Sequence, residues 1–91
     1  MREDEQDEGR CRALSTFIRQ RVVKDPRAKL GRETPLVSSG LVDSLSLISI
    51  LAFVEDEFGV LIPDEAATAG AMDSIGSILR LIDAYEGSGR G

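Results

Sequence analysis

The sequence predicts an all-α fold, a small bundle of three main helices plus one short helix, with a long loop between the first two helices. Three stretches carry apolar residues at helical spacing, and no stretch alternates apolar and polar residues as a strand would. At 91 residues the chain suits one domain with a small core. We expect this domain over residues 9–85, between a disordered polar N-terminus at 1–8 and a flexible tail at 86–91.

The first helix is expected from Arg10 to Val23. Pro26 ends it, because the residue before a proline disfavours helical conformation. The following loop, from Lys24 to Asp43, is long for a compact domain, and loops of that length are usually functional. The apolar face of the helix falls at positions i, i+3, i+4 and i+8, namely Leu14, Phe17, Ile18 and Val22.

The second helix is expected from Ser44 to Phe58. Asp43 suits the N-cap position, because its carboxylate can accept a hydrogen bond from a backbone N–H that has no partner within the helix. Gly59 suits the C-terminal end, where the backbone commonly turns left-handed.

Two further helices follow. Pro63 and Asp64 open a short third helix of one or two turns. Asp73 and Ser74 can cap the fourth helix. Its apolar residues again follow helical spacing, at Ile75, Ile78, Leu79 and Ile82.

The second helix has two apolar faces. At 100° per residue, one stripe spans an arc of about 100° and is expected in the core. This stripe contains Leu47, Ile50, Leu51, Val54 and Phe58, with Phe53 on its flank. A second set lies on another side of the helix, where polar and acidic residues surround two aliphatic side chains. This second set contains Leu45, Ile48, Ser49, Ala52, Glu55 and Asp56.

The second set has more than one interpretation. Exposed apolar residues are normal on protein surfaces, and the long loop could also fold over them. The sharper hypothesis is a docking surface for a partner protein, with Leu45 and Ile48 as its anchors.

Composition removes several functional classes. The chain has no histidine and one cysteine, which excludes Ser-His and Cys-His pairs, histidine metal sites and an intrachain disulfide. It has no apolar run long enough to span a bilayer and no signal-peptide pattern, so we expect a soluble, cytoplasmic protein without a membrane partner. The net charge of −5 argues against nucleic acid and favours basic protein partners.

The most specific motif precedes the second helix. A serine at a helix start, such as Ser44, is common and by itself indicates little. The whole run from Pro35 to Leu45, PLVSSGLVDSL, resembles the modification-site motif of acyl and peptidyl carrier proteins. The similarity continues in the expected order through Phe53–Val60, Ile62–Glu65 and Met72–Ile75.

This resemblance implies that 4′-phosphopantetheine from coenzyme A is attached covalently to Ser44. In that family a separate transferase binds coenzyme A and magnesium and supplies the chemistry. Asp43 would then lie near the transferase's magnesium, in addition to capping the helix. The helix N-terminus favours a phosphodiester, because its backbone N–H groups and dipole attract negative charge. The chain would be a tethered substrate carrying thioesters, not an enzyme.

The implied partners are a phosphopantetheinyl transferase, an acyl-loading or adenylating enzyme, and downstream synthase or tailoring enzymes. A discrete monomer is expected by analogy. Many fatty-acid carriers have acidic residues early in the second helix, whereas this chain has Ser46 and Ser49 there. We therefore expect a specialised pathway of polyketide or nonribosomal-peptide type.

Three alternatives stay open. The cargo could be acyl or aminoacyl. A small helical interaction domain that is never modified would share the same bundle and surface. An enzyme is strongly disfavoured, because the sequence has no histidine, no paired acid motif and no glycine-rich phosphate loop.

Overall fold

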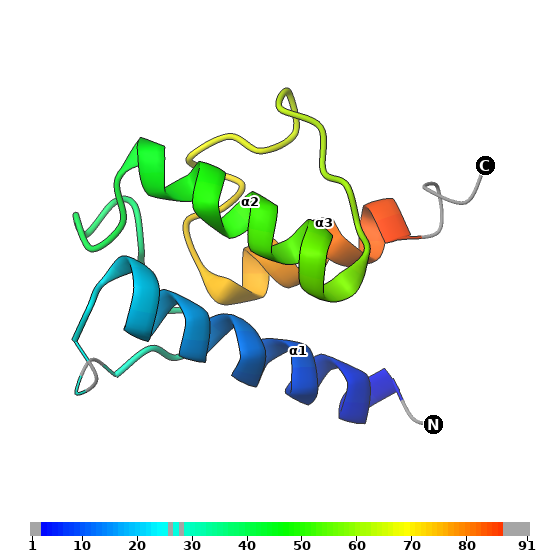
Figure 1. The fold of residues 1–91 in the computed structure, drawn as a ribbon, viewed down its shortest axis with the longest axis horizontal. Coiled ribbons are helices and arrows are strands. Elements are labelled where there is room, and N and C mark those ends of the chain that lie inside the picture. The colour runs from blue at the N-terminus through cyan, green and yellow to red at the C-terminus, as the bar shows by residue number, and fades with distance from the viewer. Residues whose placement is uncertain (1–2, 26, 28, 87–91) are drawn as a thin grey trace.

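The computed structural model describes residues 3–25, 27 and 29–86. Within these ranges all regular structure is helical, which confirms the expected bundle. The elements are α1 (Glu3–Phe17), a π-helical turn η1 (Ile18–Val22), α2 (Ser44–Phe58) and α3 (Ile75–Glu86). Helices α1 and α2 run in roughly opposite directions, and α3 lies behind α2 (Figure 1). The start of α2 lies at the opposite end of the molecule from the first residues of α1.

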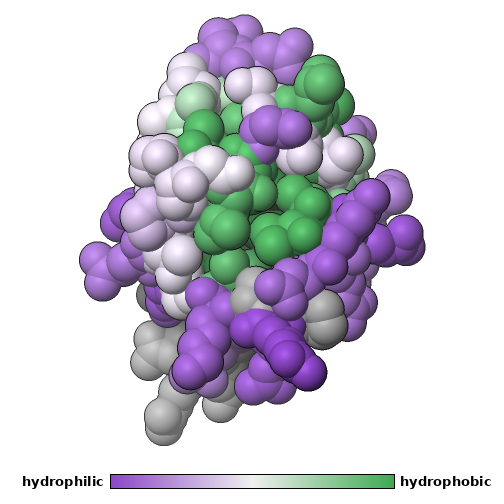
Figure 2. Space-filling model, turned by 90° about the vertical axis from the view of Figure 1, so that its left-hand side faces the viewer, coloured by the Kyte–Doolittle hydropathy of each residue, from purple (hydrophilic) through white to green (hydrophobic). Residues whose placement is uncertain are grey.

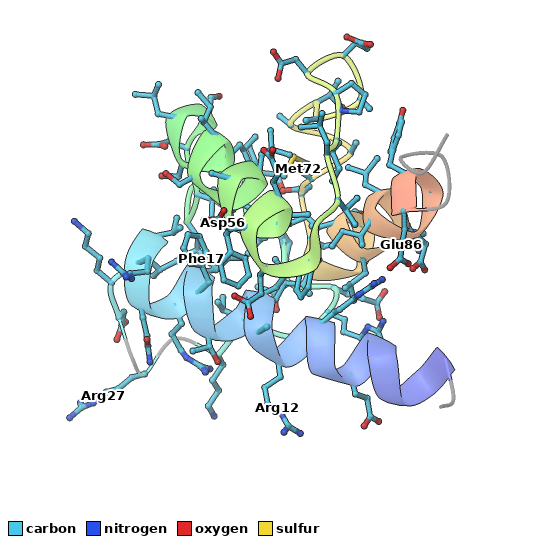
Figure 3. All side chains as sticks on the ribbon, turned by 45° about the vertical axis from the view of Figure 1, so that its right-hand side comes forward. Arg12, Phe17, Arg27, Asp56, Met72 and Glu86 are labelled. Atoms are coloured by element: carbon cyan, nitrogen blue, oxygen red, sulfur yellow. The ribbon has the colours of Figure 1, made fainter. Side chains whose placement is uncertain are left out.

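The core forms where the apolar faces of the three helices meet. In α1 and the following η1, Leu14 and Ile18 are fully buried, whereas Phe17 and Val22 are half-buried. Phe17 points from α1 toward α2 (Figure 3), where its ring stacks on Phe53 with 4.3 Å between the centroids. Each fully buried aliphatic side chain contributes about 1.5–3 kcal/mol. The buried apolar residues are Leu14, Ile18, Leu36, Val42, Leu47, Ile50, Val54, Val60, Ile62, Met72, Ile75, Ile78, Leu79 and Ile82.

The expected core stripe of α2 is only partly correct. Leu47, Ile50 and Val54 are buried, but Leu51 and Phe58 are half-buried. Leu51 packs against the edge of the core and also lines a surface groove. Phe58, the last residue of α2, lies under an arginine of α1. Both residues occupy positions where the neighbouring elements, and not the helical phase, decide burial.

The ends of α2 confirm the sequence interpretation. The Asp43 carboxylate accepts a 2.8 Å hydrogen bond from the backbone N–H of Ser46, which makes Asp43 the N-cap. Gly59 has φ = 67° and its N–H donates to the Glu55 carbonyl, as a left-handed C-terminal residue does.

Helix α1 begins earlier in the chain than the expected start at Arg10. Its first residue is Glu3, and residues 1–2 of the expected disordered N-terminus lie outside the described residues. At the other end α3 includes Glu86, and the rest of the expected tail, 87–91, lies outside them. The sequence of residues 3–8 contains three glutamates, and glutamate is a good helix former.

The expected short third helix is reduced to one turn. The N–H groups of Ala66 and Ala67 donate to the Pro63 carbonyl at 2.9 and 3.1 Å, and the helical pattern then stops. The hydroxyl of Thr68 accepts from a backbone N–H of the next turn, and Gly70 is a poor helix former. Both features stop the turn from propagating.

One arginine links the three helices. Arg10 of α1 is only 8% exposed. Its guanidinium donates to both carboxylate oxygens of Glu86 at the end of α3, and one of its nitrogens lies 3.5 Å from Asp83. The guanidinium also lies 5.5 Å from the centre of the Phe58 ring of α2. A charged group is therefore held where its polar atoms have partners and its plane covers an aromatic ring.

We expect Arg10→Met to lower the free energy of unfolding by about 1–2 kcal/mol, because it removes charge-assisted hydrogen bonds from a partly exposed acceptor. Urea unfolding followed by circular dichroism measures this, since the chain has no tryptophan. Arg12→Met is the matched control, because Arg12 lies on the same helix and points away from the bundle (Figure 3). Equal losses for both variants would contradict a specific role for the Arg10 contacts.

Candidate functional site

The start of α2 places Ser44 on the surface. Ser44 is exposed and is the first residue of the helix, directly after its cap. The bond from the Ser46 backbone N–H holds the pKa of the Asp43 carboxyl below its ordinary value, so the cap is charged at neutral pH. The first turn of α2 has no acidic side chain. The positive end of the helix dipole beside Ser44 therefore favours a negatively charged group.

The loop before Ser44 is closed into a compact turn. Leu36 and Val42 are both buried, and the Val42 N–H donates to the Leu36 carbonyl at 2.9 Å. Between them Gly40 has φ = 85°, a conformation that favours glycine, and its N–H donates to the Val37 carbonyl. Two core side chains thus fix the backbone that leads into Ser44.

The aliphatic anchors beside Ser44 are not covered by the loop. Leu45 is 76% exposed and Ile48 is 63% exposed. The interpretation in which the loop folds over them is therefore wrong. Figure 2 views the end of the molecule that carries the start of α2 and shows apolar surface at its centre, with hydrophilic residues around it. Apolar side chains that gather in one patch are one signal of an interaction surface, whereas scattered single ones are normal.

Sequence reasoning missed two further exposed leucines. Leu41 is 42% exposed in the loop before Ser44, and Leu61 is 69% exposed in the segment after α2. Val60 and Ile62 are buried on either side of Leu61. The burial alternates as in an extended segment, but all three residues are apolar, so the sequence has no pattern that identifies Leu61 as outward-facing.

A shallow groove begins at Ser44. It has a volume of about 290 Å³ and runs along α2 against the segment that contains the single turn. Its apolar lining comes mainly from Leu47, Ile48 and Leu51, and Asp64 borders it. The groove gives an apolar group tethered to Ser44 a place to lie against the protein. Its full lining is Ser44, Leu47, Ile48, Leu51, Asp64, Ala67 and Ala69.

The six candidate docking residues are all exposed, but they divide between two surfaces. Leu45 and Ile48 lie in the first turns of α2, next to Ser44. Glu55 is exposed further along the helix. The other three border a wider groove between α1 and α2, whose lining also includes Phe17 and Phe53; they are Ser49, Ala52 and Asp56.

The described residues contain neither a cluster of metal ligands nor a helix that could cross a membrane. In that part of the chain, no three His, Cys, Asp or Glu side chains are arranged to hold a metal ion. Within the same residues, each helix is too short or too polar to cross a membrane.

No protein-family model and no curated protein matches the chain. A solved structure described as "Crystal structure of FAD-dependent dehydrogenase" contains a chain of similar fold, with a TM-score of 0.68 and 28% sequence identity. The alignment covers 76% of this chain and 97% of that chain. The matched chain is therefore shorter than this one, and the likeness extends over nearly its whole length.

Proposed function

We propose that this protein is a carrier that holds acyl intermediates as thioesters on a 4′-phosphopantetheine arm attached to Ser44. The observation that carries the proposal is the exposed Ser44 hydroxyl at a capped helix start with no acidic side chain in its first turn. The Asp-Ser-Leu motif and the compact turn before it support the same assignment.

The residues around Ser44 fit such an arm. Its phosphodiester would lie at the positive end of the α2 dipole, and the groove would receive the apolar part of the cargo. When attached, the arm supplies the thiol that forms the thioester. On attachment Ser44 Oγ would bond to the phosphorus that carries the pantetheine, and the pyrophosphate bond of coenzyme A would break. Adenosine 3′,5′-bisphosphate would leave, and the serine proton would pass to a base of the transferase. The carrier's contribution is a high effective concentration of cargo near each partner.

The groove favours acyl over aminoacyl cargo. Leu47, Ile48 and Leu51 provide apolar contacts that an acyl chain would use, and Asp64 is the one charged side chain in the lining of the groove. With acyl cargo, the proposed role is that of a specialised acyl carrier. Its partners would be a transferase, a loading enzyme and downstream enzymes.

The proposal is tested by intact mass after incubation with coenzyme A, Mg²⁺ and a promiscuous phosphopantetheinyl transferase. A gain of about 340 Da, localised to Ser44 by fragmentation, is the expected result. The absence of a gain with two unrelated transferases would favour the alternative, an unmodified helical interaction domain.

The structural comparison suggests one partner class. The matched chain is short, and dinucleotides such as FAD are commonly bound by sheets flanked with helices, whereas the residues described here form helices without a strand. We infer that this chain does not bind FAD and instead presents its cargo to an FAD-dependent dehydrogenase. Such an enzyme removes two hydrogens from its substrate, as a proton and a hydride, and FAD becomes FADH₂.

An acyl thioester on the modified chain should therefore bleach the flavin of the dehydrogenase named in the matched structure with a kcat/KM roughly tenfold above that of the same acyl group on coenzyme A. The increase comes from contacts between the carrier surface and the enzyme. Stopped-flow absorbance of the flavin measures it. Equal values for the carrier and coenzyme A thioesters would contradict this partner assignment.

A further inference from the structure

Asp73 connects the start of α3 to the loop before Ser44. One of its carboxylate oxygens, Oδ1, accepts the backbone N–H groups of Val37 and Ser38 at 2.7 and 2.8 Å. The other, Oδ2, accepts the Ser38 hydroxyl at 2.8 Å. The Asp73 carbonyl also accepts the Leu36 N–H at 2.6 Å. Four hydrogen bonds thus join segments that lie far apart in the sequence.

The carboxylate of Asp73 is not used as a helix cap, contrary to the sequence expectation. The hydroxyl of Ser74 performs that role, because it accepts the Ser77 N–H at 3.1 Å. The pKa of the Asp73 carboxyl lies below its ordinary value. The main cause is the hydrogen bond from the Ser38 backbone N–H, and the bond from the Ser38 hydroxyl adds to it. The hydrogen bonds to the loop are therefore charge-assisted at neutral pH, and such bonds are stronger than neutral ones.

Two further contacts link the residues that Asp73 holds to the start of α2. Leu36, held by Asp73, is fully buried, and its carbonyl accepts the Val42 N–H. Val42 is 1% exposed and directly precedes the cap residue of α2. The described residues of the loop, 24–25, 27 and 29–43, form no helix or strand, so ordering them costs conformational entropy that such fixed points must offset.

We propose that Asp73 is a positioning residue for the modification of Ser44: by holding residues 36–38, it keeps the turn before α2 in the form that the transferase binds. This inference rests on the proposed function. Without Asp73 the turn would populate other conformations. The apparent affinity of the transferase would then fall in proportion to the remaining competent fraction, while the saturated rate would stay the same.

The test is steady-state modification by a purified transferase with coenzyme A and Mg²⁺. For Asp73→Ala we expect KM for the carrier to rise about tenfold with kcat within twofold of the parent. Asp73→Asn should restore most of the parent KM, because its amide oxygen still accepts the two backbone N–H groups. Asp25→Ala is the matched control: Asp25 is exposed in the same loop and accepts the Arg27 N–H at 3.0 Å, away from the turn.

Amide hydrogen exchange gives a second readout that needs no modification. In Asp73→Ala the Val42 N–H should exchange at least about tenfold faster, whereas N–H groups in the middle of α2 should keep the parent rate. A parent KM for Asp73→Ala would overturn the positioning role. The role would also be overturned if kcat/KM fell only in proportion to the fraction of folded protein, measured by urea unfolding. The substitution would then act by unfolding the chain. A parent chain that is never modified would instead overturn the proposed function, and the positioning role with it.

Discussion

Replacing Ser44 with alanine should abolish the mass gain that coenzyme A, Mg²⁺ and a transferase produce in the parent chain. The variant should keep a free energy of unfolding within about 1 kcal/mol of the parent. The chemistry requires this outcome, because alanine has no oxygen to form the phosphodiester. Stability should survive because the capping bond runs from the Ser46 N–H to Asp43 and does not use the Ser44 hydroxyl.

Ser49→Ala is the control for this experiment. Ser49 is an exposed serine on the same helix, so the variant should gain the full mass. A gain in Ser44→Ala would place the attachment on another residue. Unfolding of Ser44→Ala would show that the serine has a structural role, and the loss of modification would then carry no weight.

The part of the site that sequence could predict is local. The start of α2 follows from one capping residue, Asp43, and its end from one glycine, Gly59; both act within a single helical turn. The direction of Leu45 and Ile48 follows from helical phase, because both lie away from the stripe that faces the core. Their exposure also requires that the loop leaves them uncovered, which the structure shows.

The rest depends on contacts between distant segments. Asp73 looks like a capping residue in the sequence, yet its carboxylate binds Val37 and Ser38, which lie some 35 residues earlier. Periodicity assigns Leu51 and Phe58 to the core stripe, but the elements opposite them leave both half-buried. A helical phase gives the direction of a side chain, while its burial is decided by what the rest of the chain packs against it.

The long loop illustrates the same point. Its length predicts a functional segment, and its glycine predicts a turn, but neither shows where the loop is fixed. In the structure the fixed points are the buried side chains of Leu36 and Val42 and the bonds to Asp73. These combine a local turn with a contact from α3, which no pattern within the loop encodes.

Ile50→Ala should have the largest effect on stability. Ile50 is fully buried in the middle of α2, and truncation of such a residue costs about 2–5 kcal/mol through lost transfer free energy and the cavity left behind. A domain of this size has a total stability of roughly 5–14 kcal/mol. The variant should therefore lose a large share of its stability, seen as a lower urea midpoint with an unchanged slope.

Ile48→Ala separates the two faces of the helix. The same change two residues earlier, at a side chain that is 63% exposed, should alter stability by less than about 0.5 kcal/mol but lower kcat/KM for modification about tenfold. Leu61→Ala is the control for exposure, since Leu61 is 69% exposed but follows the far end of α2. It should change neither quantity. If Ile48→Ala destabilised the fold while Ile50→Ala impaired only transfer, the helix would be rotated relative to its partners and the docking surface would lie on the other face.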